Sequence, residues 1–373
     1  MNESMRETVV IQSPAFLSLE LTSRCNLRCS YCYHFDSSSA DCGDLPTTEW
    51  LQFFDELQSL KVFTVILSGG EPFIRPDIFD IIEKCAASKI RYTLLTNATL
   101  ISAEYAKRLA AIGRCNVLQV SLDGVGAVND EARGKGSFDA AVKGIRNLMD
   151  AGLKVYPRLT YSHHNVGRLE ETADFMFKEL GVKSFGTNGA TVFSDNKKDK
   201  QAVELSIREY AAAMREHQLV LKKYPGRIAA MSGPMASLRT WSNMLKAKRD
   251  NIQVVCGGCH ATCTIVYQAM SVRPDGAMLA CTSFPEHVLG YINKDKIADV
   301  WRNNEFINEL RALRRKPLSD YEYCRDCEYR PWCAGGCPAV ALQYNDGTRP
   351  SCGARLCLRK FLEVVPDFDF ELD

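Results

Sequence analysis

Three cysteines near the start of the chain have a spacing that suits iron–sulfur chemistry. Cys25, Cys29 and Cys32 form a C-x3-C-x2-C pattern within the segment SRCNLRCSYCY. Three thiolates this close in sequence can bind three irons of a cubane cluster and leave the fourth iron without a protein ligand. A structural zinc site normally closes four ligands, and no fourth residue has a clear spacing, although His34 lies nearby. The trio therefore predicts a cluster with one open coordination position.

A second set of cysteines is concentrated in the last third of the chain. Part of this set forms a C-x2-C-x5-C-x3-C run, and another part a Gly-x4-Cys element at Gly276. A zinc ribbon could use the C-x2-C pair, but ten cysteines exceed one such site, and His260 and His287 lack zinc spacing. We expect two further iron–sulfur clusters. The ten cysteines are Cys256, Cys259, Cys263, Cys281, Cys324, Cys327, Cys333, Cys337, Cys352 and Cys357.

The composition narrows the class of protein. Sixteen cysteines in 373 residues, with no signal peptide visible, predict a cytoplasmic protein whose thiols bind metal rather than form disulfides. The net charge of +1 gives no reason to expect a nucleic-acid partner, and no apolar run is long enough to predict a membrane span. Cys42, Cys85 and Cys115 lie outside both sets, and we interpret them as structural.

Residues 15 to about 189 alternate short apolar runs with amphipathic stretches, which is typical of βα units around a parallel sheet. Six predicted strands fit an α/β fold, a partial (β/α)6 TIM-like barrel. They are Phe16–Leu21, Phe63–Leu67, Tyr92–Thr96, Val117–Ser121, Lys154–Thr160 and Lys183–Gly186. Ligands of parallel α/β sheets sit at the carboxyl ends of the strands, and the first cysteine trio follows such an end.

The remaining chain divides into an N-terminal extension and two further regions. We expect an extension at 1–14, the barrel at 15–200, a helical bridge at 201–250 and a C-terminal cysteine-rich auxiliary-cluster domain at 251–373. Within the last region the sequence predicts a strand pair around Met270–Leu279, with a turn at Pro274–Gly276. It also predicts one amphipathic helix near Ile297–Leu313.

Further motifs follow the predicted strands in a recognisable order. Ser68-Gly69-Gly70-Glu71-Pro72 ends the second strand, Thr96-Asn97 the third, and Ser121-Leu122-Asp123-Gly124 the fourth, followed by Arg133-Gly134. Together with the trio and Tyr31, this order resembles the radical S-adenosylmethionine (SAM) superfamily. The resemblance implies that the open iron chelates SAM. It also implies that the reduced [4Fe-4S] cluster cleaves SAM to a 5′-deoxyadenosyl radical, which abstracts a substrate hydrogen.

The same resemblance implies a set of SAM contacts. Glycines allow close backbone approach, and a carboxylate offers charge to the ammonium of SAM. By resemblance, Ser121 and Arg133 lie near the ribose and carboxylate of SAM, and Tyr31 lies by its adenine. The full set of expected SAM-binding residues is Tyr31, Gly69, Gly70, Glu71, Asn97, Ser121, Asp123 and Arg133.

The C-terminal set resembles the SPASM domain, an auxiliary-cluster module. In that pattern one cluster takes upstream cysteines, Cys281 and Cys337. The other takes Cys324, Cys327, Cys333 and a late cysteine. Cys256, Cys259 and Cys263 compete for at most two positions, and Cys352 competes with Cys357. Both choices stay open at the level of sequence.

The resemblance favours an enzyme that modifies a ribosomally made peptide by crosslinking or epimerisation. Alternatives are haem or tetrapyrrole side-chain modification, sulfatase-type formylglycine maturation and, outside enzymes, an iron–sulfur electron carrier. Sulfatase-maturing relatives carry an aspartate directly after the cysteine equivalent to Cys281, where this chain has Thr282. Expected partners are a peptide or small-molecule substrate and an electron donor such as flavodoxin or ferredoxin. Only about fifteen residues precede the first strand, fewer than a leader-binding domain needs. We therefore expect either a separate leader-peptide recognition protein or direct binding of the peptide in the cleft between the domains.

Overall fold

A single ten-stranded sheet organises the protein. The structure is a computed structural model that describes residues 10–32, 34–36, 42–191, 203–261, 263–343 and 356–372, without the side chains of 342 and 343. The strand order is β10-β9-β8-β1-β2-β3-β4-β5-β6-β7, and β1 to β6 pair in parallel as predicted. The strands are β1 (Phe16–Glu20), β2 (Thr64–Ser68), β3 (Arg91–Thr96), β4 (Cys115–Ser121), β5 (Val155–Tyr161), β6 (Phe185–Gly189), β7 (Ile228–Ala230), β8 (Ala269–Val272), β9 (Ala277–Leu279) and β10 (Val288–Tyr291).

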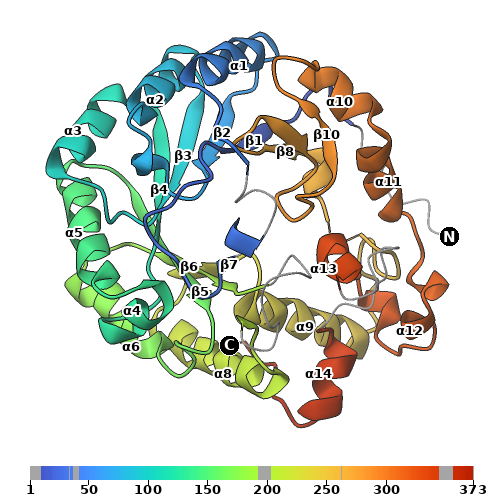
Figure 1. The fold of residues 1–373 in the computed structure, drawn as a ribbon. Helices are drawn as coiled ribbons and strands as arrows, with labels where there is room; N and C mark the ends of the chain where they lie inside the picture. Colours follow the sequence, from blue (N-terminus) through green and yellow to red (C-terminus); the bar gives the residue numbers. More distant parts are fainter. Residues whose placement is uncertain are drawn as a thin grey trace.

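Helices cover the outer face of the curved sheet, which gives the predicted partial barrel (Figure 1). Alternate residues of the strands β1 to β6, such as Leu17 and Leu19 of β1, are buried beneath these helices, so the other residues face the barrel interior. Gly152 and Gly181 follow the ends of helices and have positive φ angles. The barrel helices are α1 (Thr47–Ser59), α2 (Ile78–Ala87), α3 (Ala103–Ile112), α4 (Ala127–Arg133), α5 (Ser137–Asp150) and α6 (Leu169–Asp174), which continues into a π-helical turn, Phe175–Glu179.

The bridge is not only helical. It consists of α8 (Ile207–Lys223), β7 and α9 (Pro234–Arg249), and β7 extends the barrel sheet by pairing in parallel with β6. β7 was not predicted, because its three residues are too few to show the alternation that reveals a strand.

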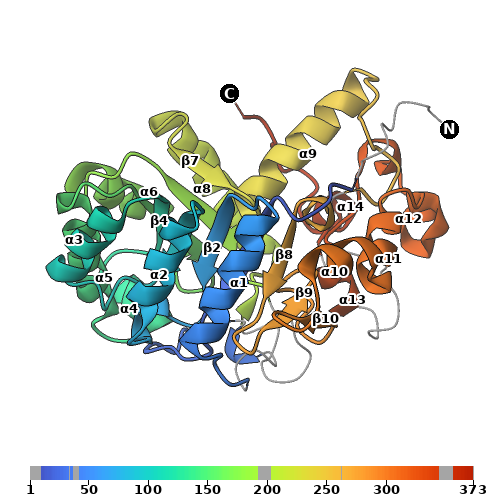
Figure 2. The ribbon, with the colours of Figure 1, turned by 90° about the horizontal axis from the view of Figure 1, so that it is seen from above.

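The auxiliary region continues the same sheet through β8, which pairs in parallel with β1. The predicted strand pair is present as the antiparallel strands β8 and β9, and β10 adds a third strand. Figure 2 shows the orange and red helices of this region beside β8, on the side of the barrel away from α3 and α5. These helices are α10 (Ile297–Asn303), α11 (Glu305–Leu313), α12 (Glu322–Arg325), α13 (Pro338–Gln343) and α14 (Leu358–Val364).

The prediction of one helix over Ile297–Leu313 was wrong. The chain breaks at Asn304, whose backbone is extended and whose side chain accepts a hydrogen bond from the N–H of Ile307. An asparagine competes with the helix for backbone hydrogen bonds and is favoured as an N-cap, so α10 ends and α11 begins there.

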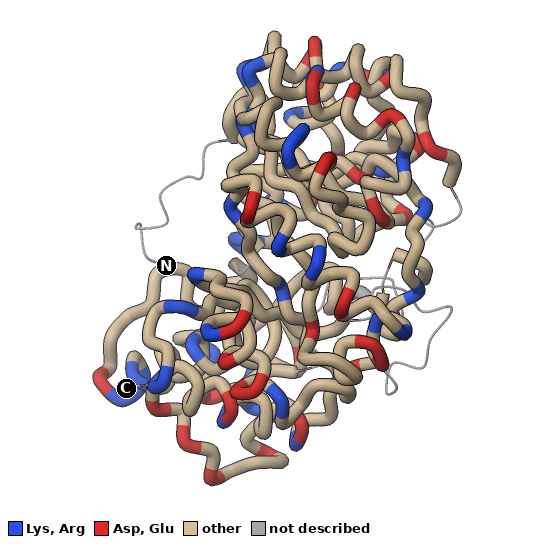
Figure 3. Tube along the Cα trace, turned by 90° about the vertical axis from the view of Figure 1, so that its left-hand side faces the viewer, with Lys and Arg blue, Asp and Glu red and all other residues tan. Residues whose placement is uncertain are grey.

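Charged residues of both signs are interspersed over the molecule (Figure 3), in agreement with the net charge of +1. Among the helices of the described ranges, none is both long and apolar enough to cross a bilayer.

Candidate active site

The loop that carries the cysteine trio follows β1 and is fixed by the neighbouring strand ends. The N–H of Gly70 donates to the carbonyl of Thr22 at 2.8 Å, and that of Glu71 to the carbonyl of Arg24 at 2.9 Å. A Cβ at Gly70 would lie 2.2 Å from the Arg24 oxygen, and one at Gly69 2.6 Å from the Thr22 oxygen. The two glycines therefore give the cysteine loop room to pack against β2, a role that sequence reasoning had attributed to ligand approach alone.

The three thiols of the loop lie near one another. Burial raises the pKa of Cys29 to about 11, and the nearby Cys25 and Cys32 raise it further, whereas Arg133 lowers it. The pKa of Cys25 is also raised, mainly by burial, with a contribution from Cys32. Buried thiols of this kind become thiolates when they bind a cation.

Several N–H groups point at these sulfurs. The backbone N–H of Leu27 donates to Cys25 Sγ at 3.4 Å, the amide of Asn97 approaches the same sulfur at 3.9 Å, and Arg133 Nη1 lies 3.9 Å from Cys29 Sγ. Hydrogen bonds to sulfur are a recurrent feature of iron–sulfur sites. Within the described ranges, no three ligating side chains surround one point closely enough for a single metal ion.

A buried network connects the cysteine loop to the end of β4. The Tyr31 hydroxyl and Arg133 Nε both donate to Asp123 Oδ2, the latter at 2.7 Å, and the N–H of Thr160 donates to Oδ1 at 2.8 Å. Asp123 is fully buried, and Arg133 lies over the Tyr31 ring at 5.6 Å. The structure thus brings three of the predicted SAM contacts together, and their direct contact with SAM stays a prediction.

Glu71 and Asn97 form a second connection, between the ends of β2 and β3. Glu71 is 1% exposed, and its carboxylate accepts hydrogen bonds from Thr96 Oγ1 and from the N–H groups of Phe73 and Asn97. Burial raises the pKa of Glu71 to about 7. Its carboxylate fixes the two strand ends, and its predicted contact with the SAM ammonium is not tested by this geometry.

Ser121 ends β4 and pairs in register with Arg158 of β5. Three polar residues occupy interior positions beside the expected SAM contacts, namely Tyr156, Arg158 and Asn188. None of them is among the expected SAM contacts, although the sequence offers Arg158 as a possible contact for a porphyrin carboxylate. In β5 the buried residues Pro157, Leu159 and Tyr161 face the helices. This alternation was the signal that could have placed Tyr156 and Arg158 in the barrel interior.

Cys263, Cys281 and Cys337 form one auxiliary group. Burial raises the pKa of Cys263 and of Cys337, and the proximity of Cys281 raises both further. The N–H of Ser283 donates to Cys281 Sγ at 3.5 Å. Among the three competing upstream cysteines, Cys263 therefore has the position expected of a ligand in the cluster with Cys281 and Cys337. Cys256 and Cys259 lie near each other instead.

The second auxiliary group contains Cys327, Cys333 and Cys357. Burial raises the pKa of Cys333, and the nearby Cys357 and Cys327 raise it further. The N–H of Gly335 donates to Cys333 Sγ at 3.3 Å. Cys324, which was predicted as a ligand of this cluster, is disulfide-bonded in the structure instead. Cys352, the competitor of Cys357, lies outside the described residues, so that choice stays open.

The cysteines interpreted as structural, and His34, have other surroundings. Cys85 is fully buried in α2, and burial raises the pKa of Cys85 and of Cys115 to about 12 and that of Cys42 to about 11. His34 Nε2 lies 2.9 Å from the carbonyl oxygen of Ser23.

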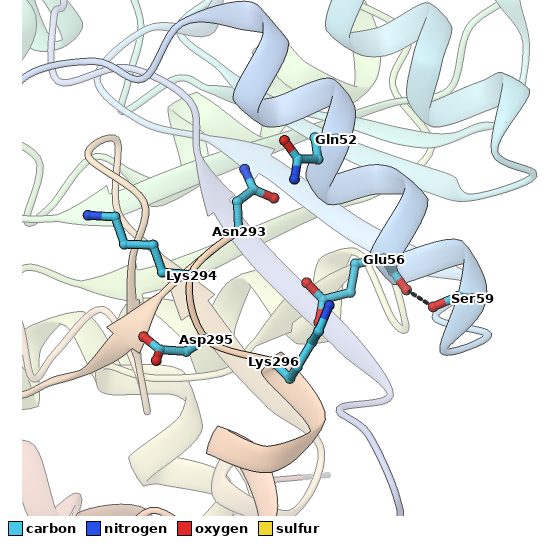
Figure 4. Close-up of a pocket in the computed structure, with 7 residues that line it drawn as sticks. All are labelled: Gln52, Glu56, Ser59, Asn293, Lys294, Asp295 and Lys296. Atoms are coloured by element: carbon cyan, nitrogen blue, oxygen red, sulfur yellow. Dashed lines mark hydrogen bonds between the residues drawn. The ribbon is translucent and has the colours of Figure 1, made fainter.

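A cavity of about 220 Å³ lies between the barrel mouth and the first auxiliary group. Gly189, Ala190 and Thr191 line it at the end of β6, and Cys337 lines it from the auxiliary region. Another groove, between α1 and residues 293–296, has a charged lining from Glu56, Lys294, Asp295 and Lys296 (Figure 4). The predicted site residues do not line that groove, so the cavity at Cys337 is the better candidate for substrate.

Comparison with known proteins agrees with this geometry. Residues 19–176 match the Radical SAM superfamily, and residues 263–328 match SPASM, described as an iron-sulfur cluster-binding domain. The chain is 30% identical over 357 residues to mycofactocin maturase MftC of Mycobacterium tuberculosis, covering 92% of this chain and 83% of the relative. The protein belongs to the radical SAM superfamily and carries a SPASM domain.

Other similar proteins differ in their named activities. An AdoMet-dependent heme synthase of Methanosarcina barkeri is 29% identical over 338 residues, which cover 87% of this chain and 91% of that one. The solved structure of Streptococcus suis SuiB bound to precursor peptide SuiA shares the fold, with a TM-score of 0.71 at 18% identity over 93% of this chain and 77% of that one. The protein is therefore a radical SAM enzyme that uses SAM and [4Fe-4S] clusters, rather than an electron carrier alone.

Proposed function

We propose that the enzyme abstracts hydrogen from a ribosomally made peptide and so forms a crosslink or an epimer. The cavity between the end of β6 and Cys337 carries this proposal, because it lies between the carboxyl end of a barrel strand and an auxiliary thiol. Gly189, Gly233 and Gly336 are among its lining residues. Backbone that is not covered by side chains can form hydrogen bonds with the main chain of an extended peptide.

Each part of the site has a distinct task in this proposal. When bound, the N-terminal cluster and SAM supply the 5′-deoxyadenosyl radical. Cys25, Cys29 and Cys32 would hold that cluster, and the Tyr31–Asp123–Arg133 network would position the loop against β4. The first auxiliary group, Cys263, Cys281 and Cys337, would hold a cluster at the wall of the cavity, where it can exchange an electron with the substrate. A flavodoxin or ferredoxin would donate the electron that reduces the N-terminal cluster. A separate leader-binding protein completes the proposal.

The relatives support a peptide substrate and also a second candidate. SuiB, which shares this fold, is solved with a precursor peptide, whereas the heme synthase relative supports tetrapyrrole modification as a second candidate. One observation favours that second candidate, namely the cationic side chain of Arg158 in the barrel interior. Formylglycine formation is less favoured, because Thr282 replaces the acidic residue that the sulfatase-maturing pattern places after Cys281.

The assay combines anaerobically reduced holoenzyme, SAM and synthetic peptides encoded beside its gene. Mass spectrometry should find a peptide that loses two hydrogens or gains deuterium from solvent. The Cys25→Ala/Cys29→Ala/Cys32→Ala variant should form neither that product nor 5′-deoxyadenosine, whereas Cys85→Ala should form both. Turnover of Fe-coproporphyrin III, without change in any peptide, would replace the peptide proposal with the tetrapyrrole one.

A further inference from the structure

An arginine inside the barrel has no acidic partner among the residues that the structure describes. Arg158 of β5 is half-buried, and in the described part of the chain it forms no ion pair with a carboxylate. Its Nε is buried without a hydrogen-bond partner. Arginine side chains removed from water are usually paired with an acid, because the desolvated charge is costly. Among the described residues, nothing compensates this positive charge, and at least one donor of the guanidinium is unused.

The neighbours of Arg158 hold the guanidinium in place without neutralising it. Its Nη2 donates to Asn188 Oδ1, and its side chain is hydrogen-bonded to that of Tyr156. Ser232 Oγ donates to the same Asn188 oxygen at 3.3 Å. Burial lowers the pKa of Arg158, and the Tyr156 hydroxyl partly offsets that effect. These partners are neutral, and the described residues supply no counter-charge, which leaves a bound molecule as a candidate for it.

Gly186 provides the space in which this group lies. A Cβ at Gly186 would lie 2.7 Å from Arg158 Nη1 and 2.8 Å from the Tyr156 hydroxyl oxygen. The residue opposite Arg158 on β6 is Gly186 itself, since the two are paired in register. The guanidinium and the phenol thus lie against Gly186, and any larger residue at that position would crowd them.

The position of Arg158 connects it to the reaction. Ser121, the expected ribose contact, pairs in register with Arg158, and the N–H of Leu122 donates to the Arg158 carbonyl at 3.0 Å. On the other side, Asn188 precedes Gly189, which lines the cavity at Cys337. Arg158 therefore lies between the predicted SAM site and the predicted substrate cavity.

We propose that Arg158, positioned by Tyr156 and Asn188, binds a carboxylate of the substrate beside the SAM site. A planar guanidinium with a free N–H suits a carboxylate, because the two groups can form parallel hydrogen bonds. This proposal deepens the proposed function by requiring a substrate with a carboxylate near the reacting carbon. A peptide provides one at its C-terminus or in an acidic side chain, and a tetrapyrrole provides one in a propionate.

The test compares acidic and neutral forms of each probe on SAM-loaded holoenzyme. One pair is made from the core peptide encoded beside the gene for this enzyme. Its acidic form has a free C-terminal carboxylate, and its neutral form has a C-terminal amide, with Asn in place of each Asp and Gln in place of each Glu. The other pair is Fe-coproporphyrin III and its tetramethyl ester. Equilibrium binding should show at least one acid binding about tenfold or more tightly than its neutral form, as for a charged hydrogen bond.

Three variants test whether the preference for the acidic form depends on Arg158. Arg158→Gln should reduce it to about twofold, Arg158→Lys should retain part of it, and Gly186→Ala should weaken it by displacing the guanidinium while keeping its charge. The dissociation constant of SAM should change less than about twofold in all three. Arg168→Gln, at an arginine whose side chain is 57% exposed, is the matched control and should keep the full preference.

The outcomes separate the two proposals. Preference for the porphyrin acid, lost in Arg158→Gln, with no peptide turnover would keep the carboxylate site and overturn the peptide function. Peptide turnover without any preference for an acidic form would overturn the carboxylate site and keep the peptide function. Absence of preference in both pairs, or a loss of SAM binding in Arg158→Gln as large as the loss of probe binding, would also overturn the carboxylate site.

Discussion

Arg133 Nε donates to Asp123 Oδ2 at 2.7 Å, and both side chains are almost completely removed from solvent. The same carboxylate oxygen accepts from the Tyr31 hydroxyl, so one buried ion pair joins the cysteine loop, α4 and the end of β4. A network of this kind positions its members together, and the loss of one member should affect the others.

Asp123→Asn should destabilise the protein strongly. It leaves the Arg133 charge buried without its counter-ion, which typically costs about 3–5 kcal/mol. We expect a lower midpoint in thermal unfolding and weaker SAM binding by equilibrium titration. The double variant Asp123→Asn/Arg133→Gln should recover part of the stability. Arg108→Gln, which removes an exposed pair with Glu83, should cost less than about 1 kcal/mol; an equal loss in both single variants would contradict the role of the network.

Gly70→Ala should displace the cysteine loop. Its Cβ would lie 2.2 Å from the Arg24 oxygen, a backbone atom that cannot move without shifting Cys25. Overpacking of this kind costs about 1–3 kcal/mol. We expect less iron per chain after reconstitution and slower 5′-deoxyadenosine formation. Gly43→Ala is the control, since no heavy atom lies within 4 Å of its Cβ position. Full iron content and activity in Gly70→Ala would show that the contact with Arg24 is dispensable.

Removal of Cys263 or Cys337 should remove one auxiliary cluster. Both thiols lie near Cys281, so Cys263→Ala and Cys337→Ala should each lose about four irons per chain. Substrate turnover should be lost, while SAM cleavage at the N-terminal cluster remains measurable. Cys85→Ala, in the core of α2, should keep its iron. Zinc in place of iron in anaerobically purified protein would refute the cluster assignment.

The second auxiliary group offers a parallel test at Cys327, beside Cys333. Cys327→Ala should also lose about four irons, and the double variant Cys263→Ala/Cys327→Ala about eight, if the two groups hold separate clusters. A double variant that loses no more iron than either single variant would show that all these thiols serve one cluster.

Glu216 should make the stability depend on pH. Burial raises its pKa from 4.5 to about 7, although Tyr161 and two backbone N–H groups near α6 donate to it. The folded state holds the proton more tightly than the unfolded state. The resulting stabilisation is complete below pH 4.5 and is lost as the pH rises through about 7. Unfolding midpoints measured between pH 5 and 8 should therefore fall more steeply in the wild type than in Glu216→Gln. Glu171→Gln, at an exposed carboxylate, should follow the wild type; parallel curves for all three proteins would contradict the raised pKa.

The barrel was predictable because its signals are local. Six strands and the glycines that end their helices each show in a short window of sequence, and all six strands lie within a few residues of their predicted bounds. The cysteine trio was likewise visible, since its spacing alone limits the chemistry. The break at Asn304 was missed because the apolar periodicity continues through it, and only the cap geometry shows that the helix stops.

Pairings between distant segments could not be predicted from one sequence. The choice of Cys263 over its two neighbours depends on how the chain folds around Cys281 and Cys337. The interior position of Arg158 depends on the register of β5 against β4 and β6. The pairing of β8 with β1 was also not predictable, since the sequence of neither strand indicates which strand it pairs with.

That last pairing has a consequence for biosynthesis. β1 is among the first elements to leave the ribosome, but its Phe16 pairs with Ala269 of β8, which is made much later. During most of translation, one backbone edge of a largely apolar strand has no partner, and such edges promote intermolecular association. A nascent chain halted before β8 should therefore need a chaperone more than the finished protein does. The auxiliary region thus serves as the closing edge of the barrel as well as the support for its clusters.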